Sequence, residues 1–76
     1  MGYEEITPHH LQRKVQYGHI EITWDPFGEN WYIQIKLKRE EFSLEHVGRV
    51  GYAYSDTAKD AANTHYSRMR AALRSI

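Results

Sequence analysis

The last third of the chain carries the pattern that most restricts the fold. Its small and apolar residues recur at the spacing of one side of a helix, and its polar residues fall on the other side. The apolar side is formed by Ala58, Ala61, Ala62, His65, Met69, Ala72, Leu73 and Ile76. Ser55 or Asp56 can cap the start of the helix, and Thr57 and Asp60 are spaced as in a capping box. We therefore predict one long amphipathic helix whose alanines let it lie close on a sheet.

Two segments in the middle of the chain, residues 17–24 and 31–38, alternate between apolar and polar residues, which is typical of β-strands. The apolar positions are Ile20, Ile22, Trp24, Trp31, Ile33, Ile35 and Leu37. The polar positions are Glu21, Thr23, Tyr32, Gln34, Lys36 and Lys38. Pro26 and Gly28 lie between the two segments and favour a turn there. The pattern predicts an antiparallel hairpin with one apolar and one polar face.

A third strand is predicted over residues 50–54, where Val50, Tyr52 and Tyr54 alternate with smaller residues. Residues 39–48 are mostly polar and acidic and are interpreted as a long connection. The predicted fold is thus α+β, a three-stranded antiparallel meander with one long C-terminal helix packed on one face.

The N-terminal segment permits two interpretations. Thr7 and Pro8 are typical of a helix start, and Leu11 and Val15 supply an apolar stripe, so residues 8–15 can form a short helix. The alternative is an irregular arm. We accordingly expect an arm or short helix over residues 1–16 and a single β-β-β-α domain over residues 17–76.

Composition limits the class of protein. The chain has 76 residues, ten basic and ten acidic side chains, a net charge of zero and no cysteine. A chain of this size forms one small domain, and the absence of cysteine excludes disulfides and thiolate metal sites. No apolar run approaches the ~18 residues that span a bilayer, so we expect a cytoplasmic protein without a membrane partner.

The polar residues show no catalytic or metal-binding pattern. The five histidines lack the local spacing of a zinc site, and no serine stands in the context of a catalytic nucleophile. Pairs of acids such as Glu40 and Glu41 are common in solvated loops. We therefore expect no enzyme activity, no metal and no cofactor.

Two short motifs resemble known families. The segment Trp31-Tyr32-Ile33-Gln34-Ile35-Lys36 and the helix start Asp56-Thr57-Ala58-Lys59-Asp60-Ala61-Ala62 resemble plant ethylene-response-type DNA-binding domains and the arm-site domains of tyrosine recombinases. This resemblance implies DNA binding through the sheet by Trp31, Gln34, Lys36 and Lys38. The order of elements is also similar to the toxin-binding domain of HicB-type antitoxins, which implies a protein partner, and, with an N-terminal helix, to the double-stranded-RNA-binding fold.

The candidate site combines the polar face of the hairpin with the last turns of the helix. Its expected partner-binding residues are Tyr32, Gln34, Lys36, Lys38, Glu40, Glu41, Arg68, Arg70 and Arg74. Acidic residues outnumber basic ones before Gly48, and basic residues outnumber acidic ones after it. Such segregated charges favour steered association with a protein, such as a toxin or a nucleoprotein. We expect a small inhibitor or antitoxin-like factor, similar in size and simplicity to those of phages and mobile elements, as a monomer or homodimer. The alternative is a protein that reads DNA through its sheet.

Overall fold

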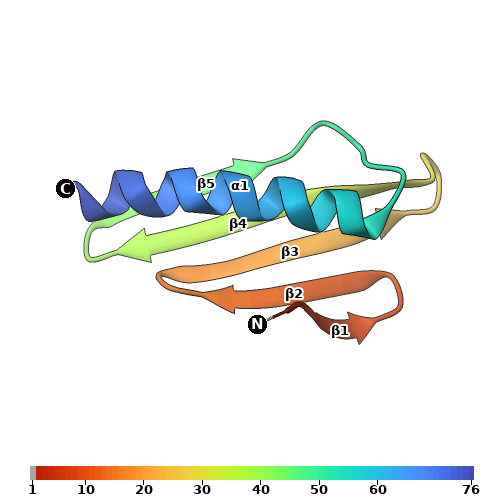
Figure 1. Cartoon of the computed structure of the whole chain (residues 1–76), viewed down its shortest axis with the longest axis horizontal. Helices are drawn as coiled ribbons and strands as arrows, with labels where there is room; N and C mark the ends of the chain where they lie inside the picture. Colours follow the sequence, from red (N-terminus) through yellow and green to blue (C-terminus); the bar gives the residue numbers. More distant parts are fainter. Residues whose placement is uncertain (1) are drawn as a thin grey trace.

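The computed structural model describes residues 2–76 and shows a five-stranded antiparallel sheet with one long helix on one face (Figure 1). Neighbouring strands follow one another in the chain, so hairpins make every connection within the sheet. The elements are β1 (Glu4–Thr7), β2 (His10–Val15), β3 (Gly18–Asp25), β4 (Asn30–Arg39), β5 (Phe42–Val47) and α1 (Ser55–Arg74). The predicted α+β class is confirmed, whereas the predicted count of three strands is wrong.

The N-terminal segment forms the first hairpin of the sheet, so both interpretations of it, the short helix over residues 8–15 and the irregular arm, are wrong. The N–H of His9 donates a hydrogen bond to Thr7 Oγ1 at 3.2 Å, and the Thr-Pro pair therefore lies in a turn rather than at a helix start. Leu11 is buried in the core from its position on β2. A short isolated helix would bury little, while a strand that pairs with β3 satisfies its backbone and buries this side chain.

The segment after β4 contains a strand that the sequence analysis interprets as a connection. β5 pairs with β4 over its whole length, with Leu44 opposite Leu37. Glu40 adopts a φ of 56°, the left-handed conformation that tight hairpin turns favour. The predicted connection over residues 39–48 is therefore wrong, because a tight turn there returns the chain along β4.

The third strand predicted over residues 50–54 does not form. Tyr52 alone makes an isolated bridge to Trp31, in which each residue donates its N–H to the carbonyl of the other, at 2.7 and 2.8 Å. β5 already occupies the neighbouring position along most of β4, so this segment can pair only at the start of β4.

The central hairpin of β3 and β4 confirms the predicted alternation. Ile22 stands opposite Ile33, and Thr23 stands opposite Tyr32 on the polar face. In the turn, the N–H of Phe27 donates a hydrogen bond to Asp25 Oδ1 at 3.0 Å. The two faces of the sheet are thus set by the parity that the sequence shows.

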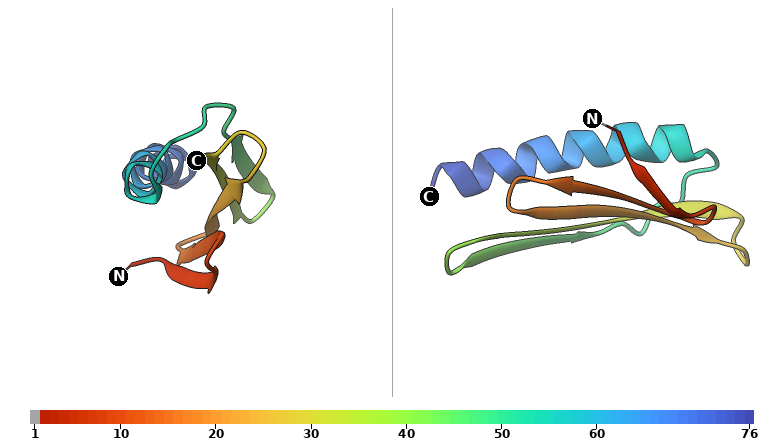
Figure 2. Two further views of the ribbon diagram at one scale, coloured as in Figure 1. Left: turned by 90° about the vertical axis from the view of Figure 1, so that its right-hand side faces the viewer. Right: turned by 90° about the horizontal axis from the view of Figure 1, so that it is seen from below.

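The core lies between the helix and the middle strands, as the end-on view in Figure 2 shows. Its buried residues are Leu11, Ile20, Ile22, Ile33, Ile35, Leu37, Ala58, Ala62, Tyr66 and Leu73. Tyr66 is absent from the predicted stripe, yet it is buried, and the guanidinium groups of Arg13 and Arg70 lie over its ring at 5.7 and 5.4 Å from the centroid. Ala72 and Ile76 are exposed, so their predicted place on the sheet-facing side is wrong.

The helix starts without the predicted side-chain cap. Tyr54 is the N-cap residue and makes no side-chain cap hydrogen bond, while Ser55 already belongs to the first turn. Asp56 lies in that turn, where the positive end of the helix dipole favours an acid, and its carboxylate is 3.6 Å from Lys59 Nζ. At the other end, Arg39 Nη1 donates to the carbonyl of Leu73 at 2.7 Å and ties the helix to β4.

The molecule is elongated along its strands and helix, with extents of 38 × 22 × 18 Å. Among the residues that the structure describes, no helix has both the length and the apolar character needed to cross a membrane.

Candidate functional site

The face of the sheet opposite the helix, here called the open face, is uncovered and polar. Cross-strand neighbours share a face, so the observed registers define its members. The open face comprises Glu4, Thr7, His10, Gln12, Lys14, His19, Glu21, Thr23, Asp25, Asn30, Tyr32, Gln34, Lys36, Lys38, Ser43, Glu45 and Val47. It is a surface that carries side chains of both charges.

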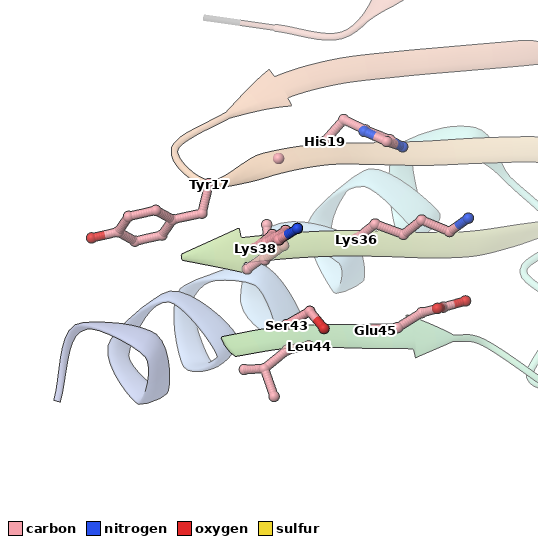
Figure 3. Close-up of a pocket in the computed structure, with 9 residues that line it drawn as sticks. Tyr17, His19, Lys36, Lys38, Ser43, Leu44 and Glu45 are labelled. Atoms are coloured by element: carbon pink, nitrogen blue, oxygen red, sulfur yellow. The ribbon is translucent and has the colours of Figure 1, made fainter. Parts of the chain in front are cut away.

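One end of the open face forms a shallow groove of about 350 Å³, here called the basic groove (Figure 3). It is lined by Tyr17, Gly18, His19, Lys36, Leu37, Lys38, Ser43, Leu44 and Glu45. Its polar side chains come from three neighbouring strands, β3, β4 and β5. Lys14 extends the basic group onto β2, because it stands opposite His19.

The lysines of the basic groove are free to bind an anion. Lys36 and Lys38 are exposed, and Glu45 is the cross-strand neighbour of Lys36. Within residues 2–76, however, basic and acidic side chains come within 4.0 Å only between His10 and Glu21 and between Lys59 and Asp56, and both contacts lie outside the groove. The groove thus presents ammonium groups that a carboxylate or phosphate of a partner can neutralise.

A close backbone contact shapes one wall of the basic groove. Gly18 begins β3 against β4, and a Cβ at this position would overlap the carbonyl oxygen of Lys36. The preceding Tyr17 has a φ of 75° and receives a hydrogen bond on its carbonyl from the N–H of Lys38 at 2.7 Å. Only glycine permits the two backbones to approach so closely.

The other half of the open face is more acidic. His10 Nε2 is buried and lies 3.5 Å from Glu21 Oε1, a contact longer than a normal hydrogen bond. Tyr32 and Gln34 are half-buried beside this pair. Beyond them, at the tip of the β3–β4 turn, the Phe27 side chain is 98% exposed.

The structure divides the predicted site residues between two surfaces. Tyr32, Gln34, Lys36 and Lys38 lie together on the open face of β4. Glu40 and Glu41 form the β4–β5 turn at the end of the sheet. Arg68, Arg70 and Arg74 lie on α1, which covers the opposite face of the sheet. The strand residues and the helix arginines therefore cannot contact one flat partner surface together.

The helix arginines also differ from one another. Arg68 and Arg74 are exposed, whereas Arg70 is half-buried with its guanidinium group over the Tyr66 ring. A cation held against an aromatic ring contributes to packing as well as to surface charge. Arg68 and Arg74 thus form the freely exposed part of this helix surface.

Sequence reasoning missed four polar residues beside the predicted lysines: Lys14, His19, Ser43 and Glu45. Three of them lie on β2 and β5, which were not predicted as strands. The usable signal is a period of two residues. Leu11, Arg13 and Val15 share one side of β2, and Phe42 and Leu44 share one side of β5. Each alternation is short, and flanking polar residues conceal it.

A smaller cavity of about 150 Å³ lies on the helix side of the sheet, between β5 and α1. The rings of His46 and His65 stack there. Burial, and to a lesser extent the neighbouring His65, lowers the pKa of His46 below its usual value of 6.5. Two histidines are too few for a stable metal site, and within residues 2–76 no group of three or more histidine, aspartate and glutamate side chains could hold a metal ion.

Comparisons with known proteins give no relative: no family model, no curated protein and no solved structure matches this chain. The resemblance to DNA-binding and antitoxin families therefore stays a prediction. The site must be interpreted from its own geometry.

Proposed function

We propose that this chain is a non-enzymatic binding module that captures a protein partner through the basic groove on its open face. The observation that carries the proposal is the set of lysines on neighbouring strands that face solvent together. Lys14, Lys36 and Lys38 are exposed on one face with His19 among them. An acidic segment of a partner, laid across the strands, would bring its carboxylates to these ammonium groups.

The mixed charge of the groove favours a protein over a free anion. Glu45 lines the groove together with Lys36 and Lys38, so the surface offers a carboxylate beside the ammonium groups. Protein interfaces match charges of both signs across the contact. The groove is shallow, and a shallow surface suits an extended partner segment better than a small molecule.

The function that we infer from this surface is inhibition. A small domain that binds tightly through one face can block the surface that it covers. We expect an inhibitor or antitoxin-like factor of a phage or mobile element, in a cell's cytoplasm, with a toxin or a nucleoprotein as its partner.

DNA binding through the sheet is the alternative, because the same lysines could contact phosphates. Glu4, Glu21 and Glu45 share the open face with the lysines, and the net charge of the chain is zero. Carboxylates on the binding face repel phosphates, and DNA affinity depends strongly on the number of phosphates neutralised. These charges support a protein partner as the first choice.

The test compares two variants with the same change in charge on opposite faces. Lys36→Glu with Lys38→Glu reverses the basic groove, and Arg68→Glu with Arg74→Glu reverses the exposed helix surface. Each tagged protein is used to capture proteins from an extract of its source cells, followed by mass spectrometry. We expect a protein that the wild type and the helix variant retain and the groove variant loses. Retention by the groove variant with loss by the helix variant would contradict the proposal.

The DNA alternative is tested by fluorescence anisotropy with a nonspecific duplex at several salt concentrations. It predicts an affinity that falls steeply as salt rises and that Lys36→Ala and Lys38→Ala weaken. Tight, salt-dependent binding to DNA with no protein captured would replace our proposal by this alternative. Undetectable or salt-independent binding would remove the alternative.

A further inference from the structure

The two edges of the sheet are protected to very different degrees. The β1 edge is only four residues long, its register shifts between Glu5 and Thr7, and it carries exposed glutamates. Short strands, bulges and charges are the usual means of preventing an edge from pairing with another chain. The β5 edge is six residues long and pairs with β4 without a register shift. Among its residues, Phe42 is 49% exposed and Leu44 is 36% exposed.

Half of the β5 backbone groups point away from the sheet. Gly48, just after β5, donates its N–H to the carbonyl of Ile33 at 2.8 Å. In an antiparallel ladder the bonded residues alternate, so Phe42, Leu44 and His46 exchange hydrogen bonds with β4. The N–H and C=O groups of Ser43, Glu45 and Val47 consequently face outward and are available to another strand.

The same edge leaves apolar side chains uncovered on the helix side of the sheet. Phe42 and Leu44 stand opposite Arg39 and Leu37, which belong to that side. The helix packs mainly on β4 and β3, so it leaves these two side chains partly exposed. A strand added beside β5 would cover them and would also satisfy the outward backbone groups.

We propose that a second copy of this chain occupies the edge, with the two β5 strands antiparallel about a two-fold axis at Leu44. This register places Leu44 opposite Leu44, Phe42 opposite His46 and Ser43 opposite Glu45 of the second copy. One continuous sheet then runs through both copies, with both helices on the same side. The exposed leucines cover each other, and the outward groups of Ser43 and Glu45 hydrogen-bond across the axis.

Charge on the open face favours this register over one centred on Glu45. Lys36 stands beside Glu45, and Lys38 stands beside Ser43, within one chain. In the proposed register, each Glu45 has Lys36 of its own chain on one side. On its other side lies Ser43 of the second copy, followed by Lys38 of that copy. Moving the axis by one residue, to Glu45, would set two carboxylates directly opposite each other, which is destabilising. The edge is thus complementary to itself, as a two-fold interface must be.

Ser43→Pro tests the pairing. Proline removes an N–H that faces outward, so the variant loses a hydrogen bond to the second copy and none to β4. Glu5→Pro is the matched control at the β1 edge. In light scattering after size exclusion at high micromolar concentration, we expect about twice the 9.0 kDa chain mass for the wild type and for Glu5→Pro. For folded Ser43→Pro we expect the mass of a single chain.

Cysteine variants test the register and do not depend on the proline variant. The chain has no cysteine, so a single introduced thiol can form a disulfide only with a second copy. At the proposed axis the Leu44 Cα atoms would be about 4.5 Å apart, within the range that a disulfide requires. Under mild oxidation we expect Leu44→Cys to form a covalent dimer much faster than Glu45→Cys.

Two outcomes would overturn the proposal. The first is a wild-type chain that stays monomeric at every concentration, with no covalent dimer from Leu44→Cys. The second is faster dimer formation by Glu45→Cys, which would place the axis elsewhere. If Ser43→Pro fails to fold, as judged by circular dichroism, the cysteine pair decides alone.

Discussion

The imidazole rings of His46 and His65 stack with their centroids 4.3 Å apart and their planes inclined by 22°, and this contact joins β5 to the helix. The stack borders the smaller cavity on the helix side, whose other lining residues are Ile33, Gly48, Arg49, Val50 and Tyr52. Burial and the neighbouring His65 both disfavour a charge on His46 and lower its pKa. The attachment of β5 to the helix is therefore sensitive to protonation.

The first prediction concerns acid. A histidine with a lower pKa in the folded chain binds fewer protons there than in the unfolded chain, so the free energy of unfolding falls as the pH falls. The loss begins near the ordinary histidine pKa of 6.5 and is complete below the lowered pKa of His46. Urea unfolding at pH 8 to 5 should show this loss, and His46→Phe should reduce its slope.

His19→Phe is the control for this experiment, because it makes the same change on the open face. If both variants alter the pH dependence equally, the stack is not its source.

The second prediction concerns Gly18. In Gly18→Ala the added methyl group overlaps the Lys36 carbonyl oxygen, so β3 and β4 must separate at this end. Overpacking of this kind costs about 1–3 kcal/mol of unfolding free energy, measured by chemical denaturation. Gly28→Ala is the matched control, because the three atoms nearest to its Cβ are side-chain atoms, at 3.1 Å and beyond. An equal loss in both variants would contradict the backbone contact.

The third prediction concerns the attachment of the N-terminal segment to the helix. Asn63 Oδ1 accepts hydrogen bonds from Tyr3 Oη and Arg13 Nη1, both at 2.8 Å. Burial raises the pKa of Tyr3, so its hydroxyl keeps the proton that it donates. Asn63→Ala should lower the unfolding free energy by about 1–3 kcal/mol and increase hydrogen exchange in β1.

Thr64→Ala is its control, since this neighbouring hydroxyl bonds only to the exposed carbonyl of Asp60 within the helix. Two results would show that the hydrogen bonds of Asn63 do not hold β1. One is faster hydrogen exchange in β1 after Thr64→Ala, and the other is an unchanged exchange rate after Asn63→Ala.

The fourth prediction separates two alanines of the helix. Ala62 is fully buried against the sheet, whereas Ala72 is exposed. Ala62→Leu should cost about 1–3 kcal/mol because its neighbours cannot move aside, while Ala72→Leu should be nearly neutral. Thermal unfolding followed by circular dichroism measures both. Similar losses at both positions would contradict the helix orientation.

The sequence predicted the parts of the fold that depend on long, uninterrupted periodicity. The alternation from Ile20 to Leu37 correctly assigns both faces of the central hairpin, including Lys36 and Lys38 on the open face. The helical spacing from Ala58 to Leu73 correctly predicts one long helix. Tyr66 was missed because a tyrosine, with its hydroxyl and aromatic ring, suits both surface and core. Its contacts with Arg13 and Arg70 become visible only in the tertiary structure.

The short elements depended on partners that are distant in the sequence. Leu11 gains its burial from the sheet and helix, and the Thr7-Pro8 pair is as compatible with a turn as with a helix start. Phe42 and Leu44 alternate too briefly to identify β5 before β4 is in place beside them. Local propensity in such segments is weak, and tertiary pairing overrides it.

By itself, then, the sequence determined the α+β class, the central hairpin, the long helix and the placement of the β4 lysines. Only the tertiary structure decided that the sheet has five strands, that the helix arginines lie on the opposite layer from those lysines, and that β5 is an unprotected edge. The physical reason is that the spacing of polar and apolar residues is encoded within each segment. The pairing of strands and the exposure of an edge depend instead on what the rest of the chain places beside them.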